Sequence, residues 1–188
     1  MTALQKSPDL KQALRKEQDA IDQQDSLARE LSSKLSQVGG ATLDTQLALR
    51  ADIVNGITSL KHDAGQAKNE ETRLVCLRTF NQLWVEGIES GQAAMENNRD
   101  FARAEFYFQM MSDVTPNDPW PALLLAEANA LRGDRKRACK VLREAIKRGL
   151  KNPEAIEKDA NLQSMRPDPE FQQIIAGLRA QAGSQPAH

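Results

Sequence analysis

The sequence predicts an all-α fold, in which an antiparallel N-terminal helical hairpin precedes an α-α superhelix of repeated helix pairs. Three observations predict it. Apolar residues recur at helical spacing along most of the 188 residues. No segment alternates apolar and polar residues between hairpin turns, as a strand would. In the C-terminal half, the order of charged, small and large apolar positions repeats with a period of 34 residues.

Residues 1–68 are expected to form the hairpin. Ser7 is a good N-cap, and Pro8 suits the first helical position because its missing N–H would have no partner there. Gly39-Gly40 ends this helix, and a second helix begins at about Thr42. The first helix has an apolar stripe whose spacing near 3.5 residues is typical of coiled coils. The stripe consists of Leu10, Leu14, Ile21, Leu27, Leu31, Leu35 and Val38.

Residues 69–182 are expected to form a helical array with a C-terminal cap, and residues 183–188 a disordered tail. Asn69 can cap a third helix, which runs without an evident break into the array. Because this helix joins the two parts, we expect one continuous helical body instead of two domains on a linker.

The 34-residue period is clearest when residues 97–118 are compared with the residues that follow them one period later. The shift places Asp100 on Asp134, Ala104 on Ala138, Phe108 on Leu142 and Met111 on Ala145. A helical segment with this period predicts helix pairs that bury their apolar faces only by stacking on their neighbours.

These segments resemble the tetratricopeptide repeat family. Its pattern contains a Gly-Asp turn, an aromatic residue, a small residue where paired helices touch, a large residue, a second small residue and a closing proline. The first unit matches at Asp100, Phe101, Ala104, Phe108 and Pro116, and the second at Gly133, Asp134, Ala138, Leu142 and Ala145. The sequence departs from the pattern at Met111, Arg135 and Leu150, which replace a small residue, an aromatic residue and the proline.

The last part of the array resembles the degenerate closing unit of bacterial tetratricopeptide arrays. Asn152-Pro153 and Asp168-Pro169 each combine an N-cap with a proline, so they are expected to open two short helices. Such caps keep the last apolar face out of water. The residues expected to cover that face are Leu162, Met165, Phe171, Ile174 and Ile175.

The resemblance implies a groove, lined by the first helix of each pair, that binds a peptide or helix of another protein. The exposed positions of these helices are expected to include Glu89, Gln92, Ala93, Glu96, Trp120, Leu123 and Glu127. The subgroup that grips the acidic tails of heat-shock chaperones uses lysine and asparagine at such places, so that activity is not carried over. A mildly acidic groove with apolar spots would suit a basic or amphipathic segment.

The strongest polar feature lies at residues 132–151, which hold nine basic and two acidic residues. Lys136, Lys140, Arg143 and Lys147 follow helical spacing and are expected to form one exposed basic stripe. The stripe could dock an acidic partner, or it could be a solvated convex face whose charges suit the helix dipole. We favour the solvated face. We do not expect nucleic acid, because no aromatic residues interleave the stripe for base stacking.

An enzymatic function is not expected, because no convergent catalytic residues are found. His62 and His188 have no spaced partner for metal binding or for a triad. Cys76 and Cys139 fall among apolar neighbours, where cysteine usually acts as a small core residue. We therefore expect no catalytic residue, no metal site and no cofactor.

Composition gives no sign of a membrane or of a polyanionic partner. The net charge is −1, with 25 basic and 26 acidic residues. The N-terminal residues lack the apolar run of a signal peptide, and no stretch is long and apolar enough for a membrane span. We expect a cytoplasmic protein without membrane association.

The favoured function is a non-catalytic adaptor or scaffold that works by protein–protein contact. One alternative is a structural or assembly subunit that oligomerises through the N-terminal helices, so homo-oligomerisation stays open. Another is an accessory domain of a larger signalling protein. Within the aromatic cluster of the first repeat, Phe101 and Phe108 are expected in the core, and Tyr107 at the surface as a partner contact.

Overall fold

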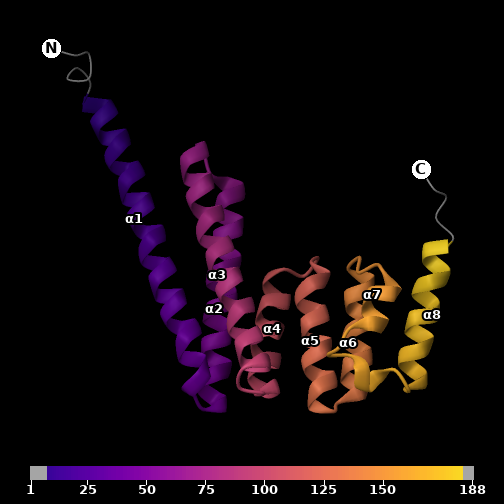
Figure 1. Cartoon of the computed structure of the whole chain (residues 1–188). Helices are drawn as coiled ribbons and strands as arrows, with labels where there is room; N and C mark the ends of the chain where they lie inside the picture. The colour runs from indigo at the N-terminus through magenta and orange to yellow at the C-terminus, as the bar shows by residue number, and fades with distance from the viewer. Residues whose placement is uncertain (1–7, 184–188) are drawn as a thin grey trace. The chain divides into compact units, whose positions relative to one another are not determined.

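The computed structural model describes residues 8–183, and within that range every regular element is helical (Figure 1). Because no β-strand occurs among these residues, the all-α prediction is confirmed for them. The helices are α1 (Pro8–Gln37), α2 (Leu43–Gln66), α3 (Glu70–Glu96), α4 (Phe101–Val114), α5 (Pro119–Arg132), α6 (Arg135–Lys147), α7 (Pro153–Lys158) and α8 (Pro169–Gly183), with 3₁₀ turns at Val38–Gly40 and Gln163–Met165.

Several expectations concern residues at the two ends. Ser7, the expected cap of α1, lies outside the described residues, as do His188 and all of the expected tail except Gly183, which ends α8. Of the helices between Pro8 and Gly183, none has the length and apolar character needed to cross a membrane.

The structure divides into two compact units, and the division falls inside α3, between Glu86 and Gly87. The helix expected to follow Asn69 is continuous from Glu70 to Glu96, so it extends through the boundary. The division lies later in the sequence than the boundary we expected after residue 68. That the whole chain forms one helical body stays a prediction.

The first unit is built from α1, α2 and the first part of α3. Val38–Gly40 forms the turn at the expected glycines, Thr42 caps α2, and the Asn69 side chain accepts a hydrogen bond of 2.7 Å from the Thr72 N–H at the start of α3. Ser32 of α1 donates a hydrogen bond of 2.8 Å to Glu86 of α3. The core combines residues of all three helices, among them Leu31, Leu35, Val38, Ile53, Ile57, Leu60, Cys76, Phe80 and Leu83.

The second unit begins with the end of α3 and continues through α4 to α8. Phe108 of α4 is fully buried and lies against the backbone of α3 at Gly91. A Cβ atom at Gly91 would lie only 2.5 Å from the phenyl ring, so the absence of a side chain allows this close packing. α5 packs along both α4 and α6.

Residues that are 34 positions apart have the same structural roles in this unit. The Asp100 side chain caps α4 by accepting a 3.0 Å hydrogen bond from the Arg103 N–H, and Asp134 caps α6 in the same way at 3.1 Å. The other three pairs are all buried: Ala104 and Ala138, Phe108 and Leu142, and Met111 and Ala145.

The C-terminal part covers the last helix pair as expected. Asn152 caps α7, and Asp168 accepts a hydrogen bond from the Glu170 N–H at the start of α8. The five residues expected to cover the last apolar face are all buried: Leu162, Met165, Phe171, Ile174 and Ile175. They form one cluster with residues of α5 and α6, including Leu123, Ala126, Cys139 and Leu142.

The expectation that Tyr107 lies at the surface is wrong, because its side chain is buried. α4 packs against α5 on one side, against α3 at Gly91, and against the α6 region, where Arg148 donates a hydrogen bond of 2.6 Å to Ser112. A helix with neighbours in several directions buries more than one face. Phe108 is in the core as expected, but Phe101, which we also expected there, is only half-buried, as is Phe106.

Candidate partner-binding site

Five of the seven residues expected in the groove line one hollow of about 340 Å³ in the second unit. They are Gln92, Glu96, Trp120, Leu123 and Glu127. We call this the acidic hollow, because its charged residues are Glu96, Glu127 and Asp159 against Lys151. The remaining lining residues are Met95, Leu124, Leu150, Ala155, Ile156 and Asn161.

The first turns of α5 position one wall of the acidic hollow. Asp118 caps the helix by accepting a 2.9 Å hydrogen bond from the Trp120 N–H, and Pro119 occupies the first helical position. Trp120, Leu123 and Glu127 are then separated by three and four residues, so their side chains lie on one side of α5. Trp120 remains 45% exposed and offers an indole surface at the edge of the hollow.

Glu127 is the unusual residue of the site, because it is a carboxylic acid that is only 5% exposed. Burial raises its pKa from 4.5 to about 7, since the charged form loses hydration. A hydrogen bond of 2.8 Å from the Asn161 side chain acts in the opposite direction, and the nearby acids Asp159 and Glu96 raise the pKa further. Near neutral pH, the group is therefore poised between its neutral and charged forms.

The expectation that Leu123 and Glu127 are exposed is wrong. Leu123 belongs to a core cluster that includes Ile156 of α7, and Asn161, which follows α7, reaches over to Glu127. The C-terminal closing unit thus covers the side of α5 that carries Leu123 and Glu127, which we had expected to be exposed. Gln92 is half-buried, and Glu96 and Trp120 are exposed as expected.

Glu89 and Ala93 are also exposed, but they are not among the residues that line the acidic hollow. Both lie on α3, on the N-terminal side of Glu96. Their expected contact with a partner has no support from the acidic hollow, and the binding site proposed below does not include them.

The basic stripe borders a larger hollow of about 670 Å³, to which Lys136, Lys140 and Arg143 contribute. Lys147 is not among its lining residues and pairs with Glu144 at 2.8 Å. The arginines of this basic hollow already have partners within the chain: Arg137 pairs with Glu105, Arg143 with Glu170, and Arg148 with Ser112.

Of the cationic residues that line the basic hollow, Lys136 and Lys140 have neither an ion pair nor a side-chain hydrogen bond within residues 8–183. No aromatic side chain is among its lining residues, so it offers no surface for base stacking. Lysines without ion pairs and without aromatic neighbours are what we expect of a solvated face, which is the interpretation that we favoured from the sequence.

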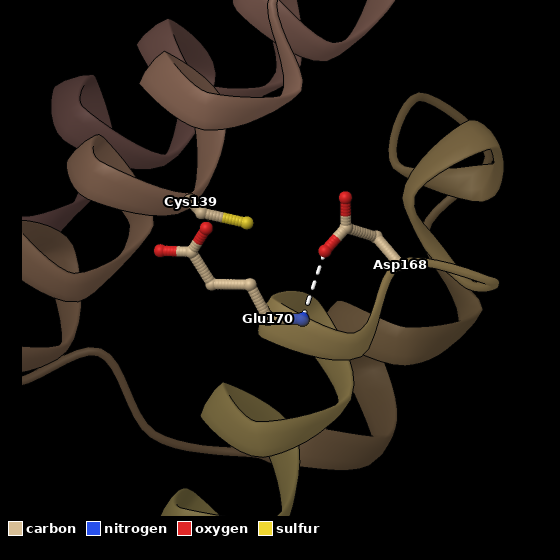
Figure 2. A group of neighbouring side chains, drawn as sticks. All are labelled: Cys139, Asp168 and Glu170. Carbon is tan, nitrogen blue, oxygen red and sulfur yellow. Dashed lines mark hydrogen bonds between the residues drawn. The ribbon is translucent and has the colours of Figure 1, made fainter.

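A further group, missed from the sequence, consists of Cys139, Asp168 and Glu170 (Figure 2). Their possible ligand atoms lie within 4.8 Å of one another. Asp168 and Glu170 stand two residues apart at the start of α8, whereas Cys139 comes from α6. No ligand spacing in the sequence links the cysteine to the two acids, so nothing there indicated the group.

The chemistry of this group fits a structural role better than a metal site. Asp168 accepts hydrogen bonds from the N–H groups of Glu170 and Phe171, and Glu170 pairs with Arg143. Burial, with the nearby charges of Glu170 and Asp168, raises the pKa of the Cys139 thiol to about 11. A metal would require the thiolate. Both cysteines are free and buried, which confirms their expected place in the core.

Comparison with family models, curated proteins and solved structures found no match for this chain. The class that the structure defines is an all-α protein with a small acidic hollow in its second unit. The tetratricopeptide resemblance therefore rests on the residues that carry it in this sequence.

Proposed function

We propose that this chain is a non-catalytic adaptor of the tetratricopeptide type, which binds a basic or amphipathic segment of another protein in the acidic hollow. Residues 34 positions apart cap a helix in the same way or are both buried, and this supports the repeat architecture. The free, buried cysteines are compatible with a cytoplasmic protein.

The observation that carries the proposal is a buried carboxylic acid, Glu127, at a hollow with an exposed indole. A buried acid without a cationic partner weakens folding, and residues that break a stability rule are often functional. Among residues 8–183, no cation forms an ion pair with the Glu127 side chain, which accepts a hydrogen bond from the Asn161 amide.

The chemistry of the hollow favours a segment with a lysine or arginine beside an apolar residue. The cationic group would lie among Glu96, Glu127 and Asp159, with charge-assisted hydrogen bonds to the carboxylates. The neighbouring part of the segment would contact Trp120, whose ring can hold either an apolar side chain or a second cation.

The proposal is tested by selecting random displayed peptides on the full chain and measuring their affinities. We expect the selected peptides to be enriched in lysine and arginine. Glu96→Lys is expected to weaken their binding by about 10-fold or more, because it reverses an exposed charge at the hollow. Glu127→Lys is less useful, since a buried lysine could prevent folding.

Glu89→Lys is the matched control. It makes the same charge change on the same helix at an exposed position that does not line the acidic hollow. If both variants weaken binding equally, or if neither does, the hollow is not the binding site.

A further inference from the structure

The apolar stripe of α1 is buried in the core of the first unit along only part of the helix. Leu31, Leu35 and Val38, near the C-terminal end, are buried against the rest of the unit. Leu10 and Leu14, near the N-terminal end, are 45% and 53% exposed. In Figure 1, the N-terminal half of α1, drawn in indigo, diverges from α2 and α3. The same face of one helix is thus in the core at one end and open at the other.

The open part keeps the spacing of a coiled-coil seam. Leu10, Leu14, Glu17, Ile21, Gln24 and Ala28 alternate separations of four and three residues, and the series continues into Leu31, Leu35 and Val38. Leucines that repeat on one face of a helix gain stability when another apolar surface covers them.

The charges along the open part indicate what covers it. Residues 11–16 carry the basic side chains Lys11, Arg15 and Lys16, and residues 17–25 carry the acidic side chains Glu17, Asp19, Asp22 and Asp25. Only Lys11 and Asp25 of these charges directly flank the seam, one residue after Leu10 and Gln24. Apart from Glu17, which is in the seam, the others lie toward the outer side of the helix. A second copy running antiparallel would bring Lys11 of each copy beside Asp25 of the other, so that two opposite-charge pairs form. A parallel copy would bring neither residue beside an opposite charge of residues 10–28, so the charges favour the antiparallel orientation.

We propose that the chain self-associates through antiparallel pairing of residues 10–28 of α1 with the same residues of a second copy. In the register that fits the seam, Leu10 packs near Ala28 and Leu14 near Gln24 of the other copy. Lys11 then lies beside Asp25 of the other copy. The paired segment is about 28 Å long, from the helical rise per residue.

This pairing uses no residue of the acidic hollow, which belongs to the other unit. A dimer would carry two hollows. A target with two basic segments would then bind more tightly than either segment alone, provided that the spacing allows both to bind at once. Self-association and peptide binding are separate properties, so one can fail without the other.

Sedimentation equilibrium of the full chain over a range of concentrations tests the pairing. We expect the wild-type mass to rise toward that of a dimer. Leu10→Ser combined with Leu14→Ser is expected to weaken dimerisation by about 100-fold or more, because four leucine contacts are lost per dimer. Leu47→Ser is the control, since Leu47 of α2 is 52% exposed but lies outside the stripe. Circular dichroism checks that each variant remains helical.

Charge reversal tests the orientation with variants that keep the leucines. Lys11→Asp or Asp25→Lys alone is expected to weaken the dimer by up to about 10-fold, and the two together are expected to restore it. A chain that stays monomeric at every concentration would overturn the proposal, and its open face would then belong to a different partner. Equal weakening by Leu47→Ser, or no restoration by the double reversal, would also overturn it.

Discussion

Phe108→Ala is expected to lower the free energy of unfolding by about 3 to 5 kcal/mol, because it removes a large buried side chain and leaves a cavity. Phe108 is fully buried, and its ring lies directly over the backbone of α3 at Gly91. The glycine has no side chain that could move into the space. Urea denaturation followed by circular dichroism measures the change.

Phe106→Ala is the matched control, because Phe106 lies on the same helix but is only half-buried. We expect a smaller loss of stability from this variant. If Phe108→Ala left unfolding unchanged but removed peptide binding, the aromatic cluster would be a ligand site and its assignment to the core would be wrong.

Glu127→Gln is expected to raise the free energy of unfolding by roughly 2 to 3 kcal/mol at about pH 8. The wild-type carboxylate must be charged there in a site that excludes water, whereas glutamine is neutral at every pH. Glutamine also has nearly the same shape, and its amide oxygen can still accept the hydrogen bond from Asn161. Denaturation midpoints of the two proteins give the difference.

The effect of Glu127 on stability depends on pH in a defined direction. The pKa of Glu127 is about 7 in the folded protein and about 4.5 in the unfolded chain. Between these values the folded state binds more protons at Glu127, so the contribution of this residue to stability is highest below about pH 4.5, falls as the pH rises to about 7, and then levels off.

Glu127→Gln should remove this part of the pH profile, while the exposed control Glu89→Gln should leave it in place. If the free energy of unfolding depended on pH in the same way for the wild type and Glu127→Gln from about pH 4 to about pH 8, the pKa of Glu127 would not lie near neutral pH.

Local signals in the sequence predicted the elements well. Thr42, Asn69, Asn152 and Asp168 each cap the helix expected after them, because capping depends on a side chain and the backbone N–H groups two or three residues away. The 34-residue shift likewise identified buried positions, since residues with equal roles in stacked helix pairs have similar chemistry.

The environment of the candidate site could not be predicted in the same way. The helical spacing of Trp120, Leu123 and Glu127 indicates a common side of α5, and this proved correct. The burial of Glu127 depends on Asn161, which lies 34 residues later in an irregular segment after α7. The spacing of residues within one helix carries no information about such a cover, so neither the burial nor the raised pKa followed from it.

Tyr107 and Cys139 show two other limits. Tyr107 is expected at the surface from the sequence, but it is buried because α4 has neighbours in several directions. Cys139 meets Asp168 and Glu170 only because α8 packs against α6. For α1, the sequence predicted a stripe along the whole helix but not that one end of it stays open.

The most direct test of the proposed binding site is the affinity of a selected lysine-containing peptide, measured by calorimetry at about pH 6 and about pH 8. With a pKa of about 7, Glu127 is about 10% charged at the lower pH and about 90% charged at the higher one. If the cationic peptide requires the charged form, its affinity should rise by up to about 10-fold between the two. Glu127→Gln should bind weakly at both. Equal wild-type affinities at the two pH values, with no effect of Glu127→Gln, would contradict the account.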